Sequence, residues 1–240
     1  WERLNDNNDS SVTNTSMLNT NVFDSNVSRW CVPMKQLVEA NGEQFTSCFS
    51  ASFYDNGSSG TAPAWLLNNP GEYGEWLSSV LLRLKNVHGI TATYYTILNE
   101  AGYGNGWNPS TVVPKMIKTI GPKIQSLGLP SKIQYPENLS PSGAWTAINN
   151  TWTTDPEIYP YIGMLSYHLY SSPYDPSRSQ IRDFGIAHNI PRAQTEFTGQ
   201  TVNILYDDLT LGGVSVWDLY YWETTYLTLN DSWFSRKAQY

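Results

Sequence analysis

Segments rich in β-branched and aromatic residues alternate along the chain with segments that have the apolar spacing of helices, and this alternation restricts the fold most. Candidate strands occupy residues 1–5, 45–53, 92–100, 132–138, 161–170, 192–199 and 213–223. Candidate helices occupy residues 27–40, 71–89, 109–128, 142–152, 176–189 and 200–212. Successive parallel strands need a crossover between them, usually a helix, so this order predicts a parallel sheet built of βα units.

The position of polar residues within the candidate strands favours a barrel over an open sheet. Most of these strands carry their unusual polar residues at the C-terminal end, where the active sites of barrels are built. No glycine-rich phosphate-binding loop follows the first candidate strand, as an open nucleotide-binding sheet would require. We therefore expect an α/β fold, a (β/α)8 TIM barrel that lacks the first strand and most of the last helix in this chain. No linker divides the sequence, so residues 1–240 are expected to form one barrel domain, part of a longer chain.

The charge balance narrows the classes of partner. The chain has 14 Lys and Arg against 21 Asp and Glu, a net charge of −7, which argues against nucleic acid and anionic membranes as partners. No run of about 18 apolar residues is present, so no membrane span is expected. Nothing in the sequence indicates an oligomeric state.

The polar composition is typical of a secreted, extracellular protein. Charged residues make up only 15% of the chain, while Asn, Ser and Thr are abundant. Asn-x-Ser/Thr triplets begin at Asn8, Asn14, Asn26, Asn56, Asn138, Asn149 and Asn230, and their glycosylation is left open. Cys31 and Cys48 could form one disulfide or remain two free thiols, and both alternatives stay open.

Aromatic residues are more abundant than a core requires. They account for 14% of the chain and include 10 Trp and 16 Tyr. The flat apolar faces of sugars match exposed indole and phenol rings, so this composition suggests a carbohydrate partner, with aromatic-rich core packing as the alternative.

Two glutamates, Glu100 and Glu196, each end a candidate strand. A carboxylate directly after an apolar run such as 96–98 is costly to desolvate without a function, although a capping or surface-loop role is the alternative for either residue. The two strands face each other across the mouth of a barrel, so their carboxyl groups could converge. Paired carboxylates with no basic residue in their motifs indicate glycoside hydrolysis, with one acid and one nucleophile or base.

Other chemistries fit the sequence less well. The chain has three histidines, His88, His168 and His188, and they lack the spacing of metal ligands. No G-x-S-x-G motif marks a serine nucleophile. We therefore expect neither a metal nor a cofactor.

Several motifs occur in a fixed order along the chain: ASFYDNGSSGTAPAWLL (51–67), YYTILNE (94–100), SYHLY (166–170), AQTEFTG (193–199), SVWDLYYW (215–222) and YLTLNDSWFSRKAQY (226–240). Together they resemble glycoside hydrolase family 30, a family of retaining clan A enzymes that includes glucosylceramidases, xylanases and endo-β-1,6-glucanases. The resemblance covers most of residues 45–240. It implies a retaining O-glycosyl hydrolase that takes part in polysaccharide degradation.

The resemblance also implies roles for individual residues. Glu100 would be the acid/base and Glu196 the nucleophile, with Asn99 hydrogen-bonded to the 2-hydroxyl of the sugar. Three further roles follow from the resemblance: His168 and Tyr170 would line the pocket beside the nucleophile, Trp217 would be the floor under the reacting sugar, and Arg3 would be the cation that keeps the nucleophile ionised. Trp65 is a candidate sugar-binding aromatic, and Trp107 is another because it lies on the loop after Glu100. Packing is the alternative for His168, Tyr170, Trp65 and Trp222.

The substrate is not indicated by the motifs. Ala62, Ala101 and a Gly/Ser insertion before Pro63 depart from the family pattern in the loops that would bind substrate. Xylan, β-1,6-glucan, β-galactan and a glucosyl lipid are all compatible with the resemblance, as a β-linked oligosaccharide or polysaccharide. Two other hypotheses remain: a catalytically degenerate carbohydrate-binding barrel, and a structural barrel that buries its Tyr and Trp side chains.

Overall fold

The computed structural model describes residues 9, 11–12, 20–51, 68–103, 106–199 and 201–218. The first candidate strand, with Arg3, and the segment that contains Trp65 lie outside the described residues.

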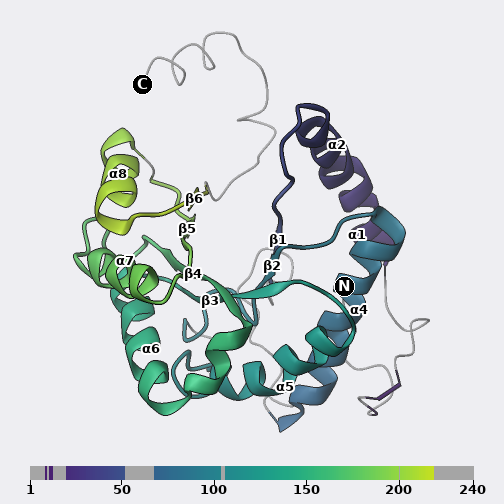
Figure 1. Ribbon diagram of the computed structural model, residues 1–240, viewed down its shortest axis with the longest axis horizontal. Helices are drawn as coiled ribbons and strands as arrows, with labels where there is room; N and C mark the ends of the chain where they lie inside the picture. The colour runs from purple at the N-terminus through teal and green to yellow at the C-terminus, as the bar shows by residue number, and fades with distance from the viewer. Residues whose placement is uncertain are drawn as a thin grey trace.

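The described strands form a parallel sheet that curls into part of a barrel, with helices on its outer side (Figure 1). Its six strands follow one another in space in their sequence order, and every neighbouring pair is parallel. The strands are β1 (Cys48–Phe49), β2 (Tyr94–Tyr95), β3 (Lys132–Asn138), β4 (Ile162–His168), β5 (Arg192–Glu196) and β6 (Val216–Trp217). The predicted alternation of strands and helices is confirmed for the described part of the chain.

The helices occupy the segments between the strands. They are α1 (Asn21–Asn26), η2 (Val27–Cys31), α2 (Val32–Ala40), α4 (Pro70–His88), α5 (Val113–Ser126), α6 (Pro141–Thr154), η3 (Pro156–Tyr161), α7 (Ser177–Ala187), α8 (Val202–Asp207) and η4 (Asp208–Gly212). Helix α4 has proline in its first turn and ends at Gly89, whose φ of 66° closes the helix in the left-handed conformation. None of the helices in the described segments is long and apolar enough to cross a membrane.

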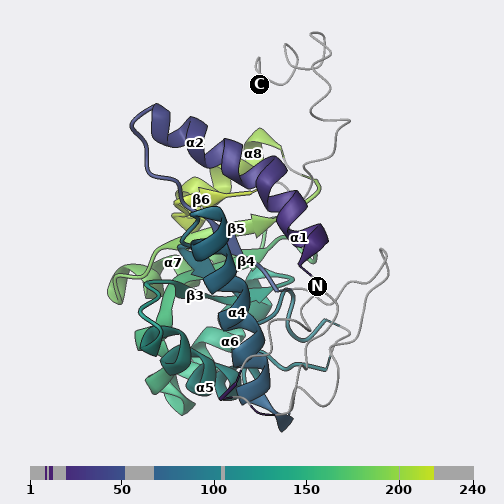
Figure 2. The same ribbon diagram turned by 90° about the vertical axis from the view of Figure 1, so that its right-hand side faces the viewer.

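The first helical segment differs from the sequence prediction in its start and in its exposure. Residues 21–40 form a continuous helix across α1, η2 and α2, which begins six residues before the predicted Val27 because the polar stretch ahead of it is also helical. Figure 2 shows this helix lying at an angle to α4. Asp24 connects the two, since it is bonded to both Arg83 and His88 of α4. The apolar residues Trp30 and Leu37 of the helix 21–40 are exposed.

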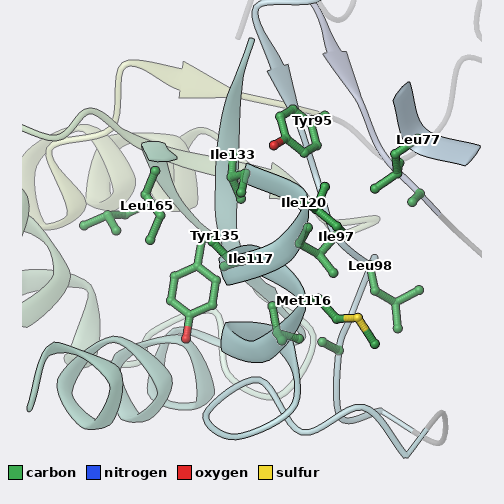
Figure 3. Packing of buried hydrophobic residues seen from close by; sticks show 14 of the residues in the cluster. Leu77, Tyr95, Ile97, Leu98, Met116, Ile117, Ile120, Ile133, Tyr135 and Leu165 are labelled. Carbon is green, nitrogen blue, oxygen red and sulfur yellow. The ribbon is translucent and has the colours of Figure 1, made fainter. Parts of the chain in front are cut away.

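The core lies between the sheet and helices α4 and α5 (Figure 3). Leu77 of α4 and Ile117 and Ile120 of α5 are fully buried, together with Ile133 of β3. Burial of one such side chain stabilises the fold by about 1.5–3 kcal/mol. This packing holds the strands rigid, and their C-terminal ends carry the candidate site.

Candidate active site

Four ionisable side chains come together at the C-terminal ends of the described strands. Glu137, His168 and Glu196 lie in the last residues of β3, β4 and β5. Glu100 follows an extended segment that continues β2 alongside β1, where Asn99 N donates to the carbonyl oxygen of Ala51 at 2.7 Å. The C-terminal end of a parallel barrel is the end at which active sites are built.

Two irregularities in strand pairing aim these side chains. The register between β3 and β4 shifts between Pro136 and Asn138, which leaves Glu137 as the extra residue of a bulge. A second shift, between β4 and β5, places Glu196 opposite His168. Bulges next to active sites redirect side chains, and both of these lie at the functional end of the sheet.

The backbone is also strained at two of the carboxylates. Glu100 has a φ of 50° and Glu137 a φ of 54°, the left-handed region that favours glycine. Each such residue costs about 1–3 kcal/mol, persists only where the surrounding structure imposes it, and is typical of functional sites. The two peptides support each other, because Glu100 N donates to the carbonyl oxygen of Glu137 at 2.9 Å.

Glu100 and Glu196 face one another over a pocket. One carboxylate oxygen of each residue and a ring nitrogen of His168 all lie within 4.8 Å of one another. The pocket has a volume of about 460 Å³ and is lined by Asn99, Glu100, Tyr103, Leu139, Tyr170, Ser171, Glu196 and Thr198. The structure therefore brings Glu100 and Glu196 together with two other residues expected at the site, Asn99 and Tyr170.

His168 is buried behind this pocket and contacts three carboxylates. Its Nδ1 lies 2.8 Å from Oε1 of Glu100 and 3.9 Å from Oε1 of Glu196. Its Nε2 lies 3.3 Å from Oε1 of Glu137. Burial opposes a charge on the imidazole, but the bonds to Glu100 and Glu137 outweigh it and raise the pKa of His168 to about 10. His168 is therefore a cation at neutral pH.

Glu196 is in an environment that disfavours its charge. Burial raises the pKa of Glu196, the charges of Glu100 and Glu137 act in the same direction, and His168 and a hydrogen bond with Tyr170 oppose the shift only in part. A nucleophile must be ionised to attack, so Tyr170 and His168 are the described groups that keep this carboxylate reactive.

Glu100, His168 and Glu196 each offer one ligand atom, and these atoms are close enough together to bind one divalent cation. The chemistry of His168 does not fit this role. A ring nitrogen binds a metal only when it carries no proton, and the bonds to Glu100 and Glu137 favour the doubly protonated ring.

Two of the aromatic residues expected at the site lie elsewhere. Trp107 is fully buried and packs edge-on against Tyr73 of α4, so the prediction that its ring forms a sugar platform is wrong. Trp217 was expected as the floor under the reacting sugar. Its indole Nε1 donates to Asp208 of η4 at 2.9 Å, on the helix side of the sheet, so this expectation is also wrong.

The position of Trp217 follows from strand register. Trp217 pairs with Gln194, and Gln194 pairs with Tyr167, so these side chains share one face of the sheet. The Tyr167 hydroxyl donates to Asp208 at 2.9 Å. Asp208 also accepts from the buried Arg178 at 3.0 Å, which ties β4, β6 and α7 together outside the barrel.

Three residues of the site region were missed by the sequence analysis. Tyr103 lines the pocket and is 59% exposed, which makes it the more exposed of the two aromatic residues in the lining. Glu137 ends a strand in a Pro-Glu-Asn sequence, the same signal that singled out Glu100 and Glu196. Asp218 follows Trp217 in the chain and, because neighbouring strand residues alternate in direction, faces the opposite side of the sheet. Burial and the charge of Glu137 raise the pKa of Asp218.

The structure decides the question of the cysteines. Cys31 and Cys48 are both free thiols, so the disulfide alternative is excluded.

Comparisons with known proteins identify relatives by structure. No protein-family model matches the chain, and no curated protein matches it in sequence. Among solved structures, the catalytic domain of the GH30 xylanase C from Talaromyces cellulolyticus matches with a TM-score of 0.61 and 17% identity over 90% of this chain and 54% of that chain. The endo-β-1,6-glucanase BT3312 matches with a TM-score of 0.57 and 16% identity over 80% of this chain and 50% of that chain.

A third structure, a monomeric β-xylosidase from Caulobacter crescentus CB15, matches with a TM-score of 0.52 and 12% identity over 78% of this chain and 48% of that chain. This chain spans about half the length of these three structures. At such identities the likeness shows the fold. The resemblance to clan A and family 30 that the motifs indicate is confirmed for the fold alone.

Proposed function

We propose that this protein is a glycoside hydrolase that cleaves β-linked glycans with retention of configuration, with Glu196 as nucleophile and Glu100 as acid/base. The observation that supports this most is the approach of the two carboxylates to within 4.8 Å across an open pocket. Carboxyl groups about 5–5.5 Å apart are typical of retaining enzymes, whereas about 6.5–9.5 Å is typical of inverting ones.

The reaction proceeds in two displacements. The Glu196 carboxylate attacks the anomeric carbon as the bond to the leaving oxygen breaks, and Glu100 gives that oxygen its proton. The negative charge of Glu196 is lost in the glycosyl-enzyme intermediate. Glu100, now ionised, then takes a proton from water as the water attacks the anomeric carbon and releases Glu196.

The substrate class is a β-linked oligosaccharide or polysaccharide. The structural neighbours are described as a xylanase, an endo-β-1,6-glucanase, a β-xylosidase and β-1,4-galactanases, and this range supports the class rather than one sugar. Asn99 lines the pocket beside Glu100 and would hydrogen-bond the 2-hydroxyl. Tyr103 lies on the acid/base side, where it would stack on the leaving-group sugar.

The same proposal extends to the architecture and location of the protein. The curled sheet is part of a (β/α)8 barrel, residues 1–240 belong to its catalytic barrel domain, and the protein is secreted. The polar composition and a structural neighbour described as an exported protein from Bacteroides fragilis support secretion.

Covalent trapping tests the proposal. The full chain is incubated with a panel of aryl glycosides of xylose, glucose and galactose, and with their 2-deoxy-2-fluoro analogues, which slow the release of the glycosyl-enzyme. We expect turnover of at least one aryl glycoside and, by peptide mass spectrometry, the fluorosugar attached to Glu196. Label on another residue, or turnover without any label, would contradict the assignment of the nucleophile.

The second candidate is a carbohydrate-binding barrel without catalysis. The raised pKa of Glu196 favours it, because a nucleophile is usually held ionised by its surroundings. This alternative predicts that the chain binds one of the oligosaccharides and releases no reducing sugar from it.

A further inference from the structure

Glu137 is a buried carboxylate of the site, and both of its oxygens have partners. It is 4% exposed, and the pocket formed by Glu100 and Glu196 is lined by other residues. Its Oε2 accepts from Gln134 Nε2 at 2.5 Å and from Thr195 Oγ1 at 3.2 Å. A residue with these contacts cannot touch substrate, so any effect on the reaction must pass through a neighbour.

The neighbour through which Glu137 can act is His168. The imidazole lies between two carboxylates, with Nε2 at 3.3 Å from Glu137 and Nδ1 at 2.8 Å from Glu100. A ring held at both nitrogens cannot rotate or flip without breaking one of the bonds. Glu137 therefore fixes which nitrogen of His168 is directed at Glu100.

Strand geometry holds Glu137 in this position. Its backbone N donates to Ser166 Oγ at 3.2 Å, and its carbonyl oxygen accepts from Glu100 N at 2.9 Å. The left-handed φ and the bulge are imposed by these contacts on both sides. Such an arrangement has no role in core packing, which an apolar side chain would serve at lower cost.

The charges around His168 explain why a buried carboxylate is useful there. Burial alone would make the imidazole neutral. The ionisable groups that face the His168–Glu137 pair are Glu100, Glu196, Tyr170, Asp218 and Cys48. Of these, Glu100 must carry a proton at the start of the reaction and Glu196 loses its charge during it, so Glu137 is the counter-ion that remains throughout.

We propose that Glu137 is a positioning residue that keeps His168 a cation directed at Glu100, so that His168 stabilises the negative charge that forms on Glu100 as its proton passes to the leaving oxygen. This inference rests on the proposed function. The proposal implies that the loss of activity on replacing Glu137 depends on the leaving group of the substrate. When the leaving group needs no proton, no negative charge develops on Glu100 and its stabilisation does not affect the rate. When the leaving group is a sugar or an alkyl alcohol, Glu100 must give up its proton and the stabilisation matters.

The test compares two substrates of the same sugar in Glu137→Gln, a nitrophenyl glycoside and an alkyl glycoside or disaccharide. We expect kcat/KM on the substrate with the poor leaving group to fall roughly tenfold or more, and kcat/KM on the nitrophenyl glycoside to stay within about threefold. Equal losses on both substrates would overturn the proposal.

Asp175→Asn is the matched control. Asp175 is also a buried, hydrogen-bonded carboxylate, but its partners are the backbone N–H groups of Ser142 and Ser177. Its loss should lower thermal stability without a dependence on the leaving group. If Asp175→Asn shows the same selectivity as Glu137→Gln, general weakening of the fold accounts for the effect and the proposal is wrong.

His168→Asn keeps the test decisive if Glu137→Gln fails to fold. The Asn amide can donate to Glu100 but cannot be charged, so it should reproduce the selective loss on poor leaving groups, and unchanged selectivity would contradict the proposal. NMR titration of the His168 imidazole in the wild type and in Glu137→Gln gives a result that needs no turnover. We expect a lower pKa in the variant, and an unchanged pKa would overturn the role of Glu137 whether or not the protein proves to be a glycosidase.

Discussion

His168 Nδ1 lies 2.8 Å from Glu100 Oε1, so the histidine of the site is bonded to the expected acid/base and not primarily to the nucleophile. From the sequence, His168 was expected beside Glu196, and its Nδ1 is 3.9 Å from that carboxylate. The buried His168 ring therefore lies close to both carboxylates, and a variant of either one changes the surroundings of the ring.

Glu196→Gln should abolish turnover and leave the fold intact. The amide is nearly the same size as the carboxylate but cannot attack the anomeric carbon, and it removes one negative charge from a cluster of like charges. Steady-state rates and thermal unfolding of the same preparation check this. A variant that folds and keeps more than about a few per cent of activity would refute Glu196 as nucleophile.

Glu100→Gln should discriminate between leaving groups. Hydrolysis of natural glycans should fall by about 10²-fold or more, because no group protonates the leaving oxygen, while nitrophenyl glycosides keep a larger share of the rate of bond cleavage. Pre-steady-state release of nitrophenol measures that step. Equal loss on activated and natural substrates would count against Glu100 as the acid.

The acid limb of the activity profile should report on Glu196. Because burial raises the pKa of Glu196 above its ordinary value of 4.5, the reactive carboxylate is lost as the pH falls through that higher pKa. Tyr170→Phe removes a hydrogen bond that lowers this pKa, so the acid limb should move to still higher pH. A pH series of kcat/KM on one aryl glycoside checks the direction, and a shift to lower pH would be inconsistent with this role for Tyr170.

Asp208→Asn should destabilise the protein. Asp208 is the closest counter-ion of the buried Arg178 and accepts hydrogen bonds from Tyr167 and Trp217. Its replacement leaves the guanidinium with only the more distant Asp207, at 3.7 Å, and should lower the free energy of unfolding by roughly 3 kcal/mol. Urea denaturation measures this, with Glu157→Gln at an exposed ion pair as a control whose midpoint should not change. Equal midpoints for the two variants would show that the Asp208 network has no stabilising role.

The sequence predicts the order of the elements well because that order depends on local patterns. The strand at 132–138 and the helix at 71–89 carry their own signals: Ile133 and Tyr135 alternate with polar residues in the strand, and the helix has a regular apolar face that ends at Gly89. The carboxylates at strand ends are visible for the same reason, since their position relative to an apolar run is a local property.

Features that depend on packing between distant segments could not be predicted. A shift of one position decides whether a strand residue faces the inside of the barrel or the helices outside it. The sequence therefore does not show which of Trp217 and Asp218 faces the inside. Trp107 is buried because its loop packs on Tyr73, a contact between segments far apart in the chain. Glu137 ends a strand as Glu100 and Glu196 do, but its contact with His168 of the next strand depends on packing and could not be predicted.

The anomeric configuration of the first product tests the central claim most directly. Proton NMR follows hydrolysis of a β-glycoside by the full chain, under conditions in which the sugar formed mutarotates slowly. We expect that the β-anomer forms first and that the α-anomer appears only by mutarotation, because Glu196 and Glu100 act in two successive displacements. Formation of the α-anomer first would show a single displacement with inversion, and would contradict the assignment of Glu196 as a nucleophile.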